Sequence, residues 1–194
     1  MIIIKHRINT INKLLSLSYK FGTEIDLRSE KNKIYLHHDP FDKGVIFERW
    51  IKNYKHKIIV LNVKEEGLEK KILQILKRNK VKNFFFHDQT FSSMLKTSTF
   101  TKVSVRLSEF EELRNFKEIL KKVKWVWIDH FTKFELSKKN YNLIKKNKAK
   151  ICIVSPELVS KLNFKKKISK IKSYIKKNNY IIDAVCTKYP KYWL

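Results

Sequence analysis

The sequence has few of the residues that shape loops and redox or metal sites. It contains three glycines, three prolines and two cysteines in 194 residues. A glycine-rich phosphate-binding loop needs several glycines close together, and Gly22, Gly44 and Gly67 are too far apart to form one. Cys152 and Cys186 lie in apolar segments without CxxC spacing, which indicates reduced core thiols and neither a disulfide nor a zinc site.

Long hydrophobic runs are absent as well. No stretch reaches the roughly 18 apolar residues that a transmembrane helix requires, so no membrane span is expected. Strand-like residues begin at Ile2, in place of the basic region and apolar stretch of a secretory leader. We therefore expect a cytoplasmic protein, long enough to form one domain over residues 1–194 with its own core. The sequence gives no indication of the oligomeric state.

Arginine is scarce in a strongly basic chain. Only six of the 44 basic residues are arginines, and the formal net charge is +26. A composition rich in lysine, isoleucine, asparagine and phenylalanine is typical of an AT-rich genome. Proteins that bind nucleic acids more often use arginine, whose guanidinium group binds phosphates and bases through two hydrogen bonds. A solvated lysine surface is therefore favoured over a polyanion-binding surface, although both attract anionic substrates.

Apolar β-type segments alternate with helical patterns along the chain. Helical spacing of apolar residues is found within 8–18, 68–76, 110–120 and 162–175. Gly22 is expected to cap the first of these helices, and Ser108–Glu111 resembles a capping box that opens the third. The predicted strands are 2–6, 23–28, 33–38, 57–63, 82–87, 102–107, 124–130, 149–155 and 180–186. Such alternation predicts parallel strands joined by helical crossovers.

The parallel strands can form either an open doubly wound sheet or a closed barrel. An open sheet is disfavoured because no glycine-rich loop follows any strand. Polar residues instead recur at the carboxyl ends of the strands, as they do at the catalytic face of a (β/α)8 barrel. The segments 23–28 and 33–38 are too close for an intervening helix and require an irregular hairpin-like step. We therefore predict an α/β fold with a single (β/α)8 TIM-type barrel.

Three clusters in the first 39 residues can perform acid–base chemistry or bind phosphate. They are His6 with Arg7, Glu24 with Asp26, and His38 with Asp39. Glu24 and Asp26 would project from one face of a strand, which is costly unless a cation, an arginine or a shared proton lies between them. Histidine titrates near neutral pH and can donate or accept a proton. The adjacent His37 should face the other way and is interpreted as structural.

These clusters, in this order, resemble the motifs of the glycerophosphodiester phosphodiesterase family of phospholipase-C-like TIM barrels. Family members carry His-Arg, Glu-x-Asp and His-Asp motifs at strand ends, a further strand that ends in Glu-x-Lys, and a closing Thr-Asp-x-Pro. The corresponding segments here are His6-Arg7, Glu24-Ile25-Asp26, His38-Asp39-Pro40, Asn62-Val63-Lys64 and Thr187-Lys188-Tyr189-Pro190. The match extends over the whole chain as a series of short motifs, which indicates a divergent, short bacterial subgroup.

The resemblance implies a role for each matched residue. His6 and His38 would be the general acid and base, and Arg7 and Lys64 would bind the substrate phosphate. Glu24 and Asp26, with Asn62, would hold a divalent cation, Mg²⁺ or Ca²⁺. Asp88 and Asp129 end strands and are candidates for the pocket.

The sequence departs from the family pattern at three positions. Ile8 replaces a glycine, Lys188 replaces the aspartate of the closing motif, and Asn62 replaces a carboxylate ligand. Three consequences stay open for the cation: a weaker site, a carboxylate recruited from Glu65 or Asp88, or a degenerate enzyme. Segments 62–67, 125–129 and 183–188 also resemble bacterial proteins sometimes encoded near surface-polysaccharide genes, which points to a substrate other than simple glycerophosphodiesters.

The sequence thus predicts a phosphodiester hydrolase, or a lyase that leaves a cyclic phosphate, acting on a small or glycan-linked phosphodiester. The alternative is a non-catalytic barrel that binds phosphate or a polyanion, either as a pseudo-enzyme or as a nucleic-acid-binding module.

Overall fold

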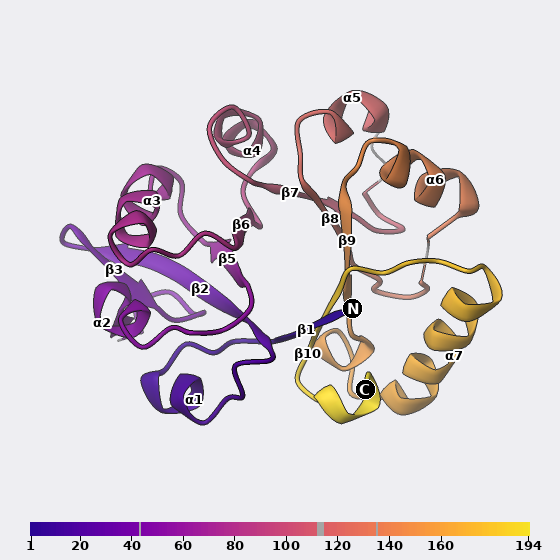
Figure 1. Cartoon of the computed structure of the whole chain (residues 1–194), viewed down its shortest axis with the longest axis horizontal. Coiled ribbons are helices and arrows are strands. Elements are labelled where there is room, and N and C mark those ends of the chain that lie inside the picture. Colours follow the sequence, from indigo (N-terminus) through magenta and orange to yellow (C-terminus); the bar gives the residue numbers. More distant parts are fainter. Residues whose placement is uncertain (43, 112–114, 135) are drawn as a thin grey trace. The chain divides into compact units, whose positions relative to one another are not determined.

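The structure is a computed structural model and describes residues 1–42, 44–111, 115–134 and 136–194. The chain forms two compact units by its contacts, one of Met1–Ile4 with Ser104–Leu194 and one of Lys5–Val103. Strands and helices alternate in chain order from β5 (Ile59–Val63) to β10 (Ala184–Thr187), as Figure 1 shows. This alternation confirms the α/β class expected from the sequence. A single domain over residues 1–194 stays a prediction.

The unit of residues 5–103 is organised around β2 (Gly22–Glu30). β2 pairs in parallel with β5, and β5 pairs in parallel with β6 (Phe84–His87). On its other side β2 pairs antiparallel with β3 (Lys33–Leu36), which pairs antiparallel with β4 (Val45–Ile46). The short β4 was not predicted. Residues 22–27 of β2 are all buried, as is typical of a strand covered on both faces.

The irregular step between β2 and β3 is a tight hairpin. Glu30 pairs with Lys33, so only Lys31 and Asn32 form the turn, and both have positive φ, 44° and 64°. Two consecutive residues with positive φ give a type I′ turn, whose twist matches that of the paired strands. The hairpin-like step predicted from the spacing of 23–28 and 33–38 is therefore confirmed.

Helices in this unit connect the strands. They are α1 (Ile11–Leu15), α2 (Phe47–Ile51), α3 (Glu69–Arg78) and α4 (Phe91–Thr97). α3 buries Ile72, Ile75 and Leu76, as the helical spacing of these residues predicts. Each such side chain stabilises the fold by about 1.5–3 kcal/mol relative to its exposed state.

The other unit contains a parallel ladder of β7 (Ser104–Leu107), β8 (Trp125–Ile128), β9 (Lys150–Val154) and β10. β1 (Ile2–Lys5) pairs with β10. The connecting helices are α5 (Phe116–Leu120), α6 (Lys138–Lys146) and α7 (Phe164–Lys177), with short 3-10 helices η1 (Pro156–Leu158) and η2 (Pro190–Tyr192). No helix within the described residues is long and apolar enough to cross a membrane.

Two helix ends differ from the sequence predictions. Gly22 is not a helix cap but the first residue of β2, because α1 already ends at Leu15 with Ser16 as its C-cap. Ser108–Glu111 does not open a helix either. Ser108 Oγ donates to Glu111 Oε2 at 2.9 Å and the two residues form an isolated β-bridge, so side-chain bonding replaces the cap, and α5 begins only at Phe116. Leu113, which the prediction included, lies outside the described residues.

Candidate active site

A buried pair of carboxylates lies on β2. Glu24 and Asp26 are two residues apart and therefore project from the same face of the strand. Their exposed fractions are 1% and 0%. Burial of two carboxylates is costly unless hydrogen bonds or positive charges compensate for the lost water. The residues that provide this compensation define the candidate site.

Glu24 is held by the segment that follows β1. The backbone N–H of Arg7 donates to Glu24 Oε2 at 2.7 Å, and the Nδ2 of Asn62 on β5 donates to Oε1 at 3.0 Å. His6 Nε2 lies 3.8 Å from Oε2. Burial, together with the negative charge of Asp26, raises the pKa of Glu24 to about 7, although the hydrogen bonds from Arg7 and Asn62 act in the opposite direction. Glu24 therefore titrates near neutral pH.

Asp26 is held by Asn9, which also lies in the segment after β1. Asn9 Nδ2 donates to Asp26 Oδ2 at 2.8 Å, and the Asp26 backbone N–H donates to Asn9 Oδ1 at 3.0 Å. Positive charges flank both carboxylate oxygens: Arg7 Nε lies 3.8 Å from Oδ2, and Lys64 Nζ lies 3.7 Å from Oδ1. The charge of Asp26 is therefore balanced by cationic side chains.

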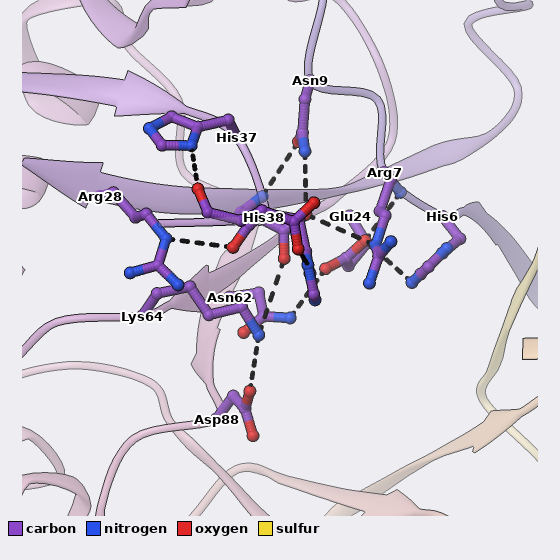
Figure 2. A network of polar contacts seen from close by, with 12 residues as sticks. His6, Arg7, Asn9, Glu24, Arg28, His37, His38, Asn62, Lys64 and Asp88 are labelled. Carbon is purple, nitrogen blue, oxygen red and sulfur yellow. Dashed lines mark hydrogen bonds and ion pairs between the residues drawn. The ribbon is translucent and has the colours of Figure 1, made fainter. Parts of the chain in front are cut away.

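Lys64 follows β5 and reaches the site from the neighbouring strand. Its backbone N–H donates to Leu27 O at 3.0 Å, which fixes its position beside β2. Its Nζ donates to Asp88 Oδ2 at 2.8 Å. Asp88 follows β6 and has a φ of 63°, a left-handed conformation that aspartate tolerates better than most residues. Figure 2 shows the end of the Lys64 side chain near Asn62, with a dashed line marking its contact with Asp88.

The two histidines after β3 have different surroundings. His38 Nδ1 contacts Asp39 Oδ1 at 2.8 Å, and Arg28 Nε donates to the backbone carbonyl of His38 at 3.0 Å. The hydrogen bond from His38 lowers the pKa of Asp39, to which the charges of Arg7 and Arg28 add a smaller effect. His37 Nδ1 contacts the backbone carbonyl of Asp39 at 2.5 Å, and its ring is turned away from the carboxylates (Figure 2).

Glu24 and Asp26 are the two charged oxygen ligands that the structure places where the resemblance predicts a divalent cation. A hard cation requires several oxygen ligands, preferably charged ones. Among the described residues no group of three acidic, histidine or cysteine side chains is placed to hold a metal ion. Asn62 is neutral and donates its amide to Glu24, and the ammonium of Lys64 lies beside the uncommitted oxygen of Asp26.

The two carboxylates considered as recruits have other partners. Glu65 Oε2 accepts from Ser29 N and Ser29 Oγ at 3.0 and 2.6 Å, and Asp88 binds Lys64. Neither therefore supplies the charge that Asn62 lacks.

The structure brings most of the sequence-predicted site residues together within residues 5–103. Direct contacts connect seven of them, which are His6, Arg7, Glu24, Asp26, Asn62, Lys64 and Asp88. His38 contacts Asp39, whose pKa the charge of Arg7 also lowers. Asp129 lies in the other unit, where it pairs with Arg106 at 3.2 Å.

Sequence reasoning missed two polar residues that organise their surroundings. Asn9 holds Asp26, and its signal in the sequence was only its position two residues after Arg7. Glu157 is buried in the other unit, where it accepts hydrogen bonds from the Thr187 hydroxyl at 2.5 Å and the Lys188 backbone N–H at 2.9 Å. The closing motif of Thr187 and Lys188 is thus anchored to a carboxylate that has no counterpart in the predicted site.

No protein-family model and no curated protein sequence matches the chain. Several solved structures, in contrast, are similar to the chain. A glycerophosphodiester phosphodiesterase from Thermotoga maritima superposes with a TM-score of 0.73 at 20% identity, covering 96% of this chain and 94% of that one. A second, from Agrobacterium tumefaciens, gives 0.68 at 10% identity over 99% and 98% of the two chains.

A third similar structure is an Oleispira antarctica phosphodiesterase solved with its product sn-glycerol-3-phosphate. It gives a TM-score of 0.68 at 17% identity and covers 98% of this chain and 94% of that one. Identities this low show a shared fold. Over nearly its whole length the chain therefore has the (β/α)8 TIM-type barrel fold of the glycerophosphodiester phosphodiesterases.

Proposed function

We propose that this protein cleaves small or glycan-linked phosphodiesters, with His6 and His38 as the proton-transferring groups. The observation that carries the proposal is the cluster around Glu24 and Asp26, where His6 Nε2 lies 3.8 Å from Glu24 and two cationic side chains flank Asp26. A fold alone does not determine a reaction, so the proposal depends on these residues and not only on the barrel.

His38 is suited to the role of general base. When Nδ1–H donates to Asp39 at 2.8 Å, the carboxylate fixes the ring orientation and leaves Nε2 as the basic nitrogen of neutral imidazole. Asp39 thereby acts as a positioning residue. His6, whose Nε2 lies 3.8 Å from Glu24 Oε2, is the second proton-transferring group.

The reaction follows from these roles. Nε2 of His38 accepts the proton of a water molecule, or of a hydroxyl group on the substrate, as its oxygen forms a bond to phosphorus. The ester P–O bond breaks on the opposite side, and His6 donates a proton to the departing alkoxide. Water gives an alcohol and a phosphomonoester, whereas a substrate hydroxyl gives an alcohol and a cyclic phosphate.

Arg7 and Lys64 are the proposed phosphate contacts. The guanidinium of Arg7 and the ammonium of Lys64 lie on either side of Asp26. Positive charges fixed in advance at the phosphate oxygens stabilise the negative charge that develops in the transition state. The product seen in the Oleispira antarctica phosphodiesterase, sn-glycerol-3-phosphate, makes glycerophosphodiesters the first substrates to test here.

The alternative, a barrel that binds phosphate or a polyanion without turnover, is not favoured. It would need the cationic side chains but gives no role to the His38–Asp39 pair or to His6 beside Glu24. It also predicts binding that weakens steeply with salt and does not depend on either histidine.

The test is to incubate the purified protein with glycerophosphodiesters and bis-p-nitrophenyl phosphate and follow the products by ³¹P NMR. The proposal predicts a phosphomonoester or a cyclic phosphate, and these two products distinguish the hydrolase from the lyase. Binding of phosphate or RNA in the absence of any cleaved ester would contradict the proposal and support the alternative.

A further inference from the structure

The ion pairs at Asp26 carry an inference about how the site compensates its negative charge. Lys64 Nζ lies 3.7 Å from Asp26 Oδ1 and 2.8 Å from Asp88 Oδ2. Its side chain is 16% exposed, so solvent screens these charges less than it would at the surface. The ammonium group of Lys64 thus bridges the carboxylate of Asp26 on β2 and the carboxylate of Asp88, which follows β6.

The remaining oxygens of the carboxylate pair have partners of their own. Glu24 Oε2 accepts from the Arg7 backbone and Oε1 accepts from Asn62, while Asp26 Oδ2 accepts from Asn9. Asp26 Oδ1 accepts no hydrogen bond among the described residues, and the ammonium of Lys64 lies 3.7 Å from it. A divalent cation at this oxygen would have to displace Lys64 or share the oxygen with it.

Residue 62 determines how much negative charge lies around Lys64. A carboxylate at position 62 would add a third negative charge beside Glu24, one more than the two cationic side chains that flank Asp26. Asparagine adds no charge and donates to Glu24 through its amide. The neutral side chain at position 62 and the ammonium at position 64 thus both limit the net negative charge around Glu24 and Asp26.

We infer that Lys64, held in position by Asp88, takes the place of a divalent cation beside Asp26, so that phosphodiester cleavage here requires no divalent cation. The cleavage part rests on the proposed function. Lys64 transfers no proton in this scheme: it supplies fixed positive charge to the phosphate oxygens while His38 and His6 exchange protons with the nucleophile and the leaving group.

The first measurement is cation binding, which does not require turnover. The full-length protein is treated with EDTA, dialysed and titrated with MnCl₂ by isothermal titration calorimetry. The inference predicts no saturable binding at millimolar Mn²⁺, and cleavage rates that agree to within about twofold with and without EDTA. Saturable binding of one Mn²⁺ per chain that disappears in Asp26→Asn would overturn it, as would activity that stops in EDTA and returns with Mn²⁺.

A second measurement uses a variant in which position 62 carries a carboxylate. Asn62→Glu places a carboxylate beside Glu24 and is expected to gain saturable Mn²⁺ binding, with a melting temperature that rises with Mn²⁺ concentration. The matched control is Asn12→Glu, which adds the same charge at an exposed position of α1 and should gain neither property. A folded Asn62→Glu protein that behaves like Asn12→Glu would overturn the role given to position 62.

A third measurement tests the ammonium directly. Lys64→Met is expected to lower kcat/KM by about 10²–10³-fold, as loss of a transition-state charge contact does, while Lys64→Arg retains part of the activity. An unchanged rate in Lys64→Met would overturn the inference. If the wild-type protein cleaves no phosphodiester under any condition, the proposed function fails, and the calorimetry still decides whether Lys64 excludes the cation.

Discussion

Asn9 and Asp26 exchange two hydrogen bonds: Asn9 Nδ2 donates to Asp26 Oδ2 at 2.8 Å, and the Asp26 backbone N–H donates to Asn9 Oδ1 at 3.0 Å. A single side chain thus fixes both the carboxylate and the backbone of a residue that is fully buried. This bidentate contact links the segment after β1 to β2, and it orients the carboxylate that Arg7 and Lys64 flank.

Replacement of Asn9 should therefore destabilise the protein. Asn9→Ala leaves a buried N–H and a carboxylate oxygen without their partner, which costs about 1–3 kcal/mol of the free energy of unfolding. The measurement is urea denaturation of the wild type and the variant. Asn12→Ala, at an exposed position of α1, is the control and should change the value by less than about 0.5 kcal/mol. Equal stability of the two variants would contradict the role given to Asn9.

The pKa of Glu24 predicts how stability varies with pH. Burial and the charge of Asp26 raise this pKa from 4.5 to about 7, so between these pH values the folded protein binds more protons than the unfolded chain. Stability contributed by the protonated carboxyl is complete below about pH 4.5 and is lost as pH rises through 7. A shift of this size corresponds to about 3 kcal/mol.

Glu24→Gln removes this dependence, because the amide has no charge to bury. The difference in free energy of unfolding between Glu24→Gln and the wild type should shift in favour of the variant, by up to about 3 kcal/mol, from pH 5 to pH 8. Other titrating groups cancel in the comparison. A difference that stays constant over this range would show that Glu24 is charged throughout.

Asp88 offers a test of its two roles, backbone conformation and contact with Lys64. Asp88→Asn keeps a side chain that tolerates the left-handed φ of 63°, whereas Asp88→Ala should cost about 1–2 kcal/mol more in stability. Both variants remove the carboxylate that holds Lys64 Nζ at 2.8 Å. Both should therefore lower kcat/KM, by about 10–150-fold, since a charge-assisted hydrogen bond contributes about 1.5–3 kcal/mol.

Steady-state kinetics and urea denaturation of the two Asp88 variants separate these effects. If Asp88→Asn is as active as the wild type, the carboxylate does not position Lys64.

The fold could be predicted largely because its signals are local and repeated. The spacing of 23–28 and 33–38 required a hairpin, and the type I′ turn at Lys31 and Asn32 is what the structure shows. The two-residue strand β4 has too few residues for any periodic pattern. At Ser108 the sequence predicted a helix start that the structure does not have. A capping-box pattern is also satisfied by a direct hydrogen bond from Ser108 to Glu111 outside a helix.

The site could be predicted only in part, because a motif specifies residue types and not their partners. Strand periodicity indicated that Glu24 and Asp26 would project from one face, and the resemblance implied that Lys64 binds the substrate phosphate. They did not indicate that Asn62 donates to Glu24 or that Lys64 Nζ lies beside Asp26, since side-chain direction depends on contacts from several strands. Asn9 follows neither a strand nor a helical pattern, and nothing in the sequence distinguishes it from a loop residue.

The most direct test of the central claim is cleavage of bis-p-nitrophenyl phosphate by three single variants, measured by release of p-nitrophenol. His6→Ala and His38→Ala should each lower kcat by about 10²–10⁴-fold, the usual effect of losing a general acid or base. His37→Ala, adjacent in sequence but turned away from the carboxylates in Figure 2, should stay within about threefold of the wild type. Wild-type rates in both His6→Ala and His38→Ala would contradict the account.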